Sequence, residues 1–293
     1  MIVSNLIGGL GNQMFQYAAG RALSLQLQQD YYLDITDLQR YQLHQGYQLE
    51  RIFAGEFKVA ADESVRAILG YQGTPFFRKI LIRKPFKYLR SRSYVVQPVF
   101  GYWNQFDQLG GDIYLHGYWQ SEKYFKKYLD VIRRDFAFKE TLSAANQCVR
   151  HQIMNTNAVS LHIRRGDYVT NVSANKMHGV CPLEYYQQAV DEILNRVRNP
   201  FFYIFSNDPT WVKKNLRLGA EHTCIDHNHG EESYNDMRLM SICKHHIIAN
   251  SSFSWWGAWL NVNPEKIVIA PRQWFATDQF ETIDLLPTDW VRV

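Results

Sequence analysis

The second half of the chain alternates short apolar runs, each long enough for a buried strand, with longer runs of helical period. This alternation constrains the fold most, because a strand that follows a helix usually pairs in parallel with the strand before it. The run at 183–198 is the clearest helix, since its apolar residues fall on one face. We predict a parallel sheet flanked by helices, with strands at 158–163, 201–205, 245–249 and 267–270 and helices at 183–198, 210–216 and 234–243.

The start of the chain predicts a second unit that also alternates strands and helices. An apolar run at 2–7 leads through a glycine-rich turn to a helix at 12–28 and a strand at 31–33. Residues 70–111 show no regular pattern and are expected to form long connections. The 293 residues exceed one ordinary core. We therefore expect two domains, 1–150 and 151–293, with a cleft between them and with the last residues able to pack back on the first domain.

Charge and hydropathy exclude several classes of protein. The chain has 32 Lys and Arg against 28 Asp and Glu, a net charge of +4. Without a basic recognition element, this bias is too mild for a nucleic-acid-binding protein. An apolar stretch of about 18 residues is missing, and so is a basic region before an apolar one at the N-terminus. We therefore expect a cytoplasmic protein.

Cysteine and histidine spacing argues against a metal site. The four cysteines are widely separated and form no C-x-x-C pair, so neither a disulfide framework nor a cysteine zinc site is expected. One group, which has ligand-like spacing, has no matching pair elsewhere, and a solvated loop is favoured over a metal centre there. That group is His222, Cys224, His227 and His229.

Two adjacent arginines, Arg164 and Arg165, follow the strand predicted at 158–163. In an open parallel sheet, ligands bind beyond the carboxyl ends of the strands. A guanidinium group donates two hydrogen bonds to one phosphate and stays charged. The pair indicates either a diphosphate clamp or a structural ion pair with Asp167. Because successive side chains of an extended segment point opposite ways, we expect Arg164 to face the ligand and Arg165 to anchor the loop with Asp167.

Polar residues also follow two neighbouring predicted strands. Ser251, Ser252, Phe253 and Ser254 open a helix after the strand at 245–249. Hydroxyl and N–H groups at a helix start suit a phosphate, although an ordinary serine N-cap explains the pattern equally well. Asn207 follows the strand at 201–205 and either lines the same crevice or caps the next helix.

The glycine-rich turn near the N-terminus offers another place for an anion. Gly9 and Gly11 stand before a helix whose first N–H groups could face a phosphate, or they form a simple tight turn. The full G-x-G-x-x-G spacing is missing, which argues against an NAD-linked oxidoreductase.

Five segments, in order along the chain, resemble the α-1,2-fucosyltransferases of glycosyltransferase family 11. They are GGLGNQMFQYA at 8–18, GYWQSEKYF at 117–125, HIRRGDY at 162–168, FSND at 205–208 and NSSFSWWGAWL at 250–260. The resemblance implies an α/β fold of the GT-B type, with two facing Rossmann-type domains and the donor bound mainly by the C-terminal one. It also implies GDP-fucose as donor, inversion at the anomeric carbon, the 2-hydroxyl of a galactose in a glycan as acceptor, and no required metal or other cofactor.

The resemblance further assigns roles to residues of the C-terminal domain. It implies that Arg164 holds the β-phosphate and that His162 and Asp167 shape the same loop. Ser251 and Ser252 are implied to contact the diphosphate.

Three further positions concern recognition of guanine, the reacting fucose and removal of the acceptor proton. Asp236 resembles the guanine-reading residue of related α-1,6-fucosyltransferases, and a carboxylate suits guanine because it accepts from N1–H and the exocyclic amine together. Asn12 resembles an asparagine near the reacting fucose in protein O-fucosyltransferases. Val172 stands where the α-1,6 motif would have a carboxylate, so either another base serves or the acceptor proton leaves late. The candidate bases are Glu122, Asp34 and His116.

Two wider questions stay open at this point. The basic segment 78–92 either lies on an anionic membrane, which would suit a lipid-linked acceptor, or forms a solvated loop. The rival functions are a transferase of the same fold with another nucleotide sugar or another linkage, and a glycan-binding protein without turnover.

Overall fold

The computed structural model describes residues 1–39, 45–166, 169, 171–277 and 279–293. The chain divides into two units, one formed by Met1–Lys139 with Glu281–Leu285 and the other by Glu140–Phe280 with Leu286–Val293. The junction therefore precedes the predicted boundary at residue 150, because helix α7 (Ala144–Met154) packs against the second unit. Close to the C-terminus, Glu281–Leu285 belong to the first unit, whereas the final segment Leu286–Val293 belongs to the second.

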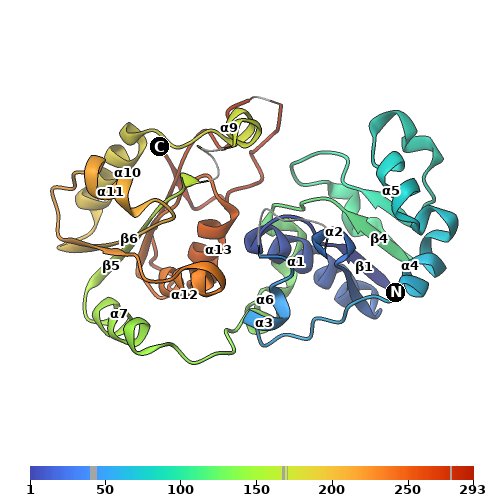
Figure 1. The fold of residues 1–293 in the computed structure, drawn as a ribbon, viewed down its shortest axis with the longest axis horizontal. Helices are drawn as coiled ribbons and strands as arrows, with labels where there is room; N and C mark the ends of the chain where they lie inside the picture. Colours follow the sequence, from blue (N-terminus) through green and yellow to red (C-terminus); the bar gives the residue numbers. More distant parts are fainter. Residues whose placement is uncertain (40–44, 167–168, 170, 278) are drawn as a thin grey trace. The chain divides into compact units, whose positions relative to one another are not determined.

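The first unit is built on a parallel sheet in the order β2–β1–β4–β3 (Figure 1). Val3 and Tyr114 on one face pack against apolar residues of α4 and α5, while Ser4 on the other face lies against α1. The elements of this unit are β1 (Ile2–Asn5), α1 (Leu10–Leu27), β2 (Tyr31–Asp34), α2 (Thr36–Gln39), α3 (Leu49–Ile52), α4 (Asp62–Leu69), η1 (Gly70–Gly73), α5 (Pro75–Leu81), η2 (Lys84–Leu89), β3 (Tyr94–Val96), η3 (Asn104–Gln108), β4 (Ile113–His116), η4 (Glu122–Tyr124), η5 (Lys126–Tyr128) and α6 (Leu129–Asp135).

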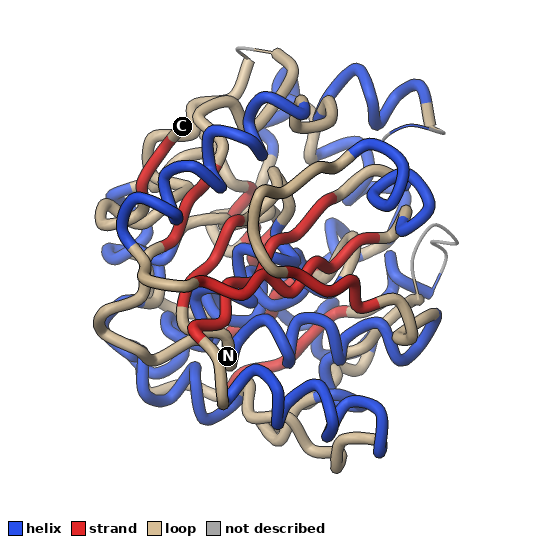
Figure 2. Tube along the Cα trace, turned by 90° about the vertical axis from the view of Figure 1, so that its left-hand side faces the viewer, coloured by secondary structure: helices blue, strands red, loops and turns tan. Residues whose placement is uncertain are grey.

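The second unit holds a larger parallel sheet in the order β10–β9–β8–β5–β6–β7. Strands run side by side between helices in Figure 2. Besides α7, its elements are β5 (Asn157–Ile163), α9 (Val172–His178), α10 (Leu183–Arg196), β6 (Pro200–Ser206), α11 (Pro209–Asn215), β7 (His222–Ile225), η6 (Gly230–Ser233), α12 (Tyr234–Ser241), β8 (His245–Ile247), α13 (Ser252–Leu260), β9 (Val268–Ala270) and β10 (Val291–Arg292).

Alternate residues of β5 face two separate cores. Leu161 and Ile163 pack with apolar residues of α10 and α11, whereas Ala158 packs with residues of α7 and α12. A strand with both faces covered is apolar at most positions, which is why β6 was recognisable as a nearly continuous apolar run. β5 is buried along most of its length although it includes Ser160 and His162. The predicted parallel sheet flanked by helices is confirmed.

The segment 70–111 is more regular than expected. It contains α5, three short 3₁₀ helices and β3, which forms the edge of the first sheet. β3 was missed because a three-residue strand carries too little periodicity to stand out. Within the described ranges, no helix is both long and apolar enough to cross a membrane.

The packing of α1 on the sheet depends on a helical glycine. A Cβ atom at Gly20 would lie 2.1 Å from Ser4 Oγ and 2.6 Å from the ring of Tyr31. The Tyr31 hydroxyl donates to the carbonyls of Tyr17 and Gln16 at 3.1 and 3.4 Å, so its ring is held in place. The missing side chain is what lets the helix approach β1 and β2 this closely.

We therefore expect Gly20→Ala to destabilise the first unit. The gain in helix propensity, about 1 kcal/mol, is outweighed by overpacking, and the net loss should be roughly 1–2 kcal/mol. Thermal unfolding should show this as a fall of about 2–8 °C in Tm. The control is Gly110→Ala, where an added Cβ meets nothing within 4 Å. An unchanged Tm for Gly20→Ala would mean that α1 can withdraw from the sheet without cost.

Candidate functional site

The loop after β5 is held to the loop after β6 through Arg165. Its backbone N–H donates to Asn207 Oδ1 at 2.9 Å, and its Nε lies 3.6 Å from Asp208 Oδ2. The guanidinium carbon stands 4.0 Å from the centre of the Trp211 ring, within cation–π range. Arg165 therefore anchors the loop, as predicted, with Asp208 as its carboxylate. The expected partner, Asp167, lies outside the described residues.

The same contact explains the glycine of the arginine motif. A Cβ atom at Gly166 would stand 2.2 Å from Asn207 Nδ2. Asn207 is exposed and bridges the ends of two strands, so its side chain positions the loop. Its neighbour Asp208 caps α11 by accepting from the N–H of Trp211 at 3.0 Å.

Arg164 and His162 have different characters although they are two residues apart. His162 is buried, and its ring centre lies 5.8 Å from that of Phe253 at the start of α13. Burial, reinforced by the positive charge of Arg164, lowers the pKa of His162 to about 3. The imidazole is therefore neutral, and Arg164, which is half-buried, carries the positive charge at this strand end.

The serine loop after β8 forms an N-cap. Ser251 Oγ accepts from the N–H of Phe253 at 3.3 Å, and α13 has no acidic residue in its first turn. The positive end of the helix dipole is therefore not neutralised by a carboxylate of α13 and favours a bound anion. Ser252 and Phe253 are half-buried there. Ser254 differs from the expectation, because it is buried and its hydroxyl donates to the Ser251 carbonyl at 3.4 Å, which removes it from any ligand surface.

Asp236 near the start of α12 belongs to a network of side-chain amides. Asn228 Nδ2 donates to Asp236 Oδ1 at 2.8 Å and to Asn146 Oδ1 at 3.0 Å, and Asn146 Nδ2 donates back to Asn228 Oδ1 at 2.8 Å. His227 Nε2 is 2.8 Å from the same Asn146 oxygen. These three partners were missed, because they come from α7 and from the loop after β7 and share no sequence pattern.

The electrostatics of Asp236 follow from this setting. Burial raises the pKa of Asp236 to about 7, and the hydrogen bond from Asn228 opposes part of that rise. Among the residues that the structure describes, none donates a hydrogen bond to its second oxygen, Oδ2. The carboxyl group is thus fixed by one oxygen and able to accept through the other.

The histidine and cysteine group considered for metal has another explanation. His227 lies against Asn146, and His222 Nδ1 lies 2.9 Å from the carbonyl of Ala220. The described parts of the chain contain no cluster of three His, Cys, Asp or Glu side chains placed to hold a metal ion.

In the first unit, the glycine-rich turn is organised by polar side chains of α1. Gly8 adopts a left-handed φ of 79°, and a Cβ there would meet Asn12 Nδ2 at 2.6 Å. Gln13 Nε2 donates to the carbonyls of Gly8 and Gly46 at 3.0 and 2.9 Å. Gly9 precedes α1 as its N-cap and Gly11 lies in the first turn, which has neither a side-chain cap nor an acidic residue.

The loop after β4 meets the same turn. Gln120 Nε2 donates to Asn12 Oδ1 at 2.7 Å. Trp119 is held at a φ of 54°, which is rare for a large side chain, and Gln97 Oε1 accepts from its N–H at 3.0 Å. The left-handed backbone at Trp119 therefore places Gln120 within hydrogen-bond distance of Asn12. Glu122, two residues on, accepts from Lys126 Nζ at 3.3 Å.

Two of the three candidate bases are poorly suited to that role. Burial alone would raise the pKa of Asp34, but Arg78, Thr36 and Tyr114 outweigh it and leave that pKa below its usual value. Its oxygens are engaged by all three of these residues.

His116 is unsuited for a different reason. Burial lowers its pKa to about 4, and its Nδ1 accepts from Asn5 Nδ2 at 3.2 Å. The neutral ring therefore carries its proton on Nε2 and has no free nitrogen lone pair to act as a base.

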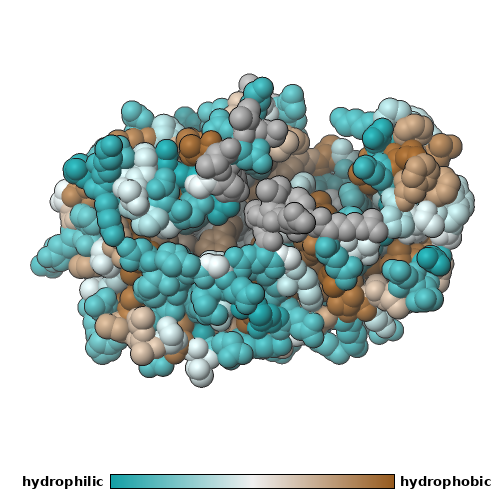
Figure 3. All heavy atoms as spheres, viewed as in Figure 1, coloured by the Kyte–Doolittle hydropathy of each residue, from teal (hydrophilic) through white to brown (hydrophobic). Residues whose placement is uncertain are grey.

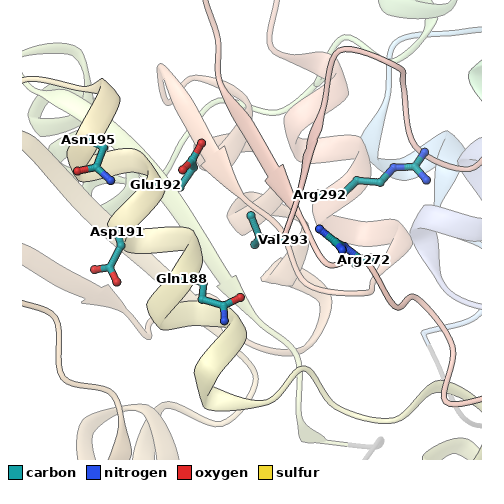
Figure 4. Close-up of a pocket in the computed structure, with 7 residues that line it drawn as sticks. All are labelled: Gln188, Asp191, Glu192, Asn195, Arg272, Arg292 and Val293. Carbon is teal, nitrogen blue, oxygen red and sulfur yellow. The ribbon is translucent and has the colours of Figure 1, made fainter.

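A surface hollow of about 590 Å³ lies beside α10 and contains none of the predicted site residues (Figure 4). It is lined by Gln188, Asp191, Glu192, Asn195, Arg272, Arg292 and Val293. Acidic and basic side chains share this shallow surface, and it does not compete with the strand-end loops as a candidate site.

Each unit is built on a parallel α/β sheet, and the likeness to solved fucosyltransferases identifies the fold as the GT-B type, as predicted. The crystal structure of the NodZ α-1,6-fucosyltransferase soaked with GDP-fucose has this fold. It matches 88% of this chain and 91% of its own, with a TM-score of 0.54 at 12% identity. The chain belongs to glycosyltransferase family 11, whose model matches residues 1–293.

Two bacterial relatives agree with this assignment. The α-1,2-colitosyltransferase of Escherichia coli is 36% identical over 302 residues, covering 100% of this chain and 99% of that protein. The O-antigen biosynthesis glycosyltransferase WbnK of Escherichia coli is 36% identical over 292 residues, 93% of this chain and 94% of that protein. The resemblance drawn from the five sequence segments is confirmed.

Proposed function

We propose that this glycosyltransferase transfers L-fucose from GDP-β-L-fucose, with inversion, to the 2-hydroxyl of a terminal galactose in a glycan. The observation that carries the proposal is the convergence of three loops at the carboxyl edge of the second sheet. Arg164 follows β5, Asn207 follows β6 and the serine N-cap follows β8, and β5 pairs with both neighbours. Such an edge, with one arginine and one open helix start, suits a diphosphate.

The guanine of the donor is assigned to Asp236. Its free oxygen and its bonded oxygen form a planar acceptor pair, which matches the N1–H and exocyclic amine of guanine. Adenine and uracil lack this donor pair. The amides of Asn228 and Asn146 fix the carboxyl plane before the base arrives, which reduces the entropy lost on binding.

The reaction we propose is a single displacement. The acceptor oxygen forms a bond to the anomeric carbon while the bond from that carbon to the β-phosphate oxygen breaks, and GDP leaves with the electron pair. Negative charge grows on the phosphate as the sugar becomes cationic, so Arg164 and the start of α13 stabilise the transition state electrostatically. With these groups assigned to the leaving phosphate, the proposed reaction needs no metal ion.

The proton of the acceptor hydroxyl is assigned to Glu122. Both oxygens of Asp34 are engaged by three residues, and the Nδ1 lone pair of His116 accepts from Asn5. Glu122 is bonded to the exposed Lys126, and we choose it from the three candidates. It follows the loop in which Gln120 contacts Asn12. We place Asn12 and Gln120 on the acceptor side of the reaction.

One relative favours a second candidate donor. The protein similar over the full chain is named for transfer of colitose, which is L-fucose without the 3-hydroxyl. A site that hydrogen-bonds this hydroxyl rejects the deoxy sugar strongly, by about 10⁴–10⁵-fold, whereas an apolar pocket discriminates by only about 10²-fold against the extra hydroxyl. GDP-colitose is therefore the competitor that tests the donor most sharply.

The decisive experiment measures acceptor-dependent GDP release with lactose, comparing GDP-fucose, GDP-colitose and GDP-mannose, each with and without EDTA. We expect release from GDP-fucose that EDTA does not change, and a product cleaved by an α-1,2-specific fucosidase. If GDP is released only from GDP-colitose, the donor is GDP-colitose and the proposed donor is wrong. Binding of GDP-fucose without release for any galactoside would favour a glycan-binding protein without turnover.

Arg164→Ala should lower kcat by at least about 10²–10³-fold, because it removes a charge that stabilises the leaving phosphate. Arg198→Ala is the matched control, since this exposed arginine precedes β6 at the opposite edge of the sheet. Steady-state kinetics on both variants, with Tm as a check of folding, distinguish the two. Full activity of folded Arg164→Ala would remove this residue from the mechanism.

The pKa of Asp236 predicts a pH dependence of GDP binding. The charged form accepts both guanine donors, so affinity should rise as the pH increases through about 7. Calorimetric titration of the wild type and Asp236→Asn between about pH 6 and pH 8 checks this. A pKa shift of one unit on binding corresponds to about 1.4 kcal/mol of binding free energy, which calorimetry resolves. Any pH dependence left in the variant belongs to the phosphate. An equal dependence in both proteins would contradict the assignment.

Glu122→Gln should lower kcat by about 10²–10⁴-fold if this carboxylate takes the acceptor proton. Lys126→Gln is a useful control, because it removes the partner of Glu122 and leaves the carboxylate. Near-normal turnover of Glu122→Gln would instead assign the step to late proton loss without a strong base.

A further inference from the structure

The segment formed by α5 and η2 exposes large apolar side chains outside the candidate site. Phe76, Tyr88 and Leu89 have 70%, 85% and 62% of their surface exposed. Hydrophobic side chains gather over this segment at the upper right of Figure 3, where α5 lies in Figure 1. Single exposed apolar residues are ordinary, but a contiguous group marks an interaction surface.

The same segment carries unpaired positive charge. Lys79, Arg83, Lys84 and Lys87 are exposed, and no acidic residue occurs from residue 64 to residue 106 of the sequence. In the described part of the chain, none of these four side chains forms an ion pair. We call Phe76, Lys79, Arg83, Lys84, Lys87 and Tyr88 the basic aromatic surface.

Two other basic residues, Arg78 and Arg90, bond to groups within the protein and are not part of the exposed surface. Arg78 is mostly buried and forms an ion pair with Asp34. Arg90 Nε donates to the Leu81 carbonyl at 2.6 Å, and its Nη2 donates to that of Ile82 at 3.1 Å. Arg90 therefore satisfies carbonyls at the end of α5, where a helix leaves them without partners.

The backbone that presents these side chains is fixed. Gln72 Nε2 donates to the Leu89 carbonyl at 2.9 Å, and Gln72 Oε1 accepts from the N–H of Ser91 at 2.9 Å. The end of η2 is thus anchored while the Leu89 side chain points into solvent. A fixed presentation costs little conformational entropy when a partner covers the surface.

We propose that the basic aromatic surface docks on an anionic lipid bilayer. Aromatic rings that stand beside lysines suit the membrane interface, where rings enter the headgroup layer and ammonium groups meet anionic phosphates. Lys87 Nζ already lies 4.7 Å from the Tyr88 ring centre, so charge and apolar surface are adjacent. The hollows beside α10 and α1 are lined by other residues, so neither belongs to the basic aromatic surface. Docking would bring the enzyme to lipid-linked glycans, a consequence that rests on the proposed function.

The test is co-sedimentation of the full chain with vesicles. We expect binding to vesicles of equal parts phosphatidylcholine and phosphatidylglycerol, little binding to phosphatidylcholine alone, and release as salt is raised to about 0.5 M. Each exposed base near an anionic surface strengthens binding roughly five-fold, so Lys84→Gln with Lys87→Gln should weaken it about 20–30-fold. Phe76→Ser with Tyr88→Ser should weaken binding at low salt although the charges are kept, because these rings contribute apolar contact with the bilayer.

Matched control variants make the same kinds of change, loss of two bases or of apolar surface, at exposed positions outside the basic aromatic surface. Lys127→Gln with Lys214→Gln removes two exposed bases, and Val262→Ser removes an exposed apolar side chain. Transfer to soluble lactose should be unchanged in all variants, which keeps this test separate from that of the proposed function. Equal loss in the control and the surface variants would overturn the proposal. So would binding to polyglutamate without binding to the anionic vesicles, because the partner would then be an acidic protein.

Discussion

The parallel pairing of β5 with β6 and β8 is the constraint on which the candidate site depends. In this register Ile163 lies opposite Ser206, so the chain leaves both strands at the same level and in the same direction. Arg165 and Asn207 meet for this reason, and Gly166 is needed where they meet. An antiparallel neighbour would have sent its loop to the opposite edge. The three loops that carry the phosphate assignment therefore share one edge by topology.

Asp34 at the end of β2 and Asp236 in the first turn of α12 show how environment sets the chemical role of a carboxyl group. Asp34 faces a guanidinium group, which keeps its pKa low and makes it a structural anion. Asp236 faces only amides among the described residues, and burial raises its pKa to about 7. An amide fixes the orientation of a carboxyl group without neutralising it, which leaves the second oxygen for a ligand. Two aspartates of the same fold are thus pushed toward opposite functions.

Polar side chains of the family motifs mostly serve the turns themselves. Gln13 satisfies carbonyls of the glycine turn, and Asn250 donates to the carbonyls of His178 and Trp274. Such buried amides are costly unless every group is paired, so each fixes several loops together. Reading these motifs as ligand contacts alone overestimates their role, as Ser254 illustrates. Its hydroxyl faces the Ser251 carbonyl inside the turn.

The sequence by itself determined the parallel sheet of the second unit, the opening of the first, the arginine loop and the family, because apolar periodicity and local turn chemistry are written in neighbouring residues. It missed β4 in the first unit and β7 and β10 in the second, because strands of two to four residues are too short to carry a clear periodicity. Tertiary structure alone decided that Asp208 holds Arg165, that Asn146 and Asn228 fix Asp236, and that Gln120 reaches Asn12. These contacts join residues distant in sequence, and their geometry exists only once the strands have paired.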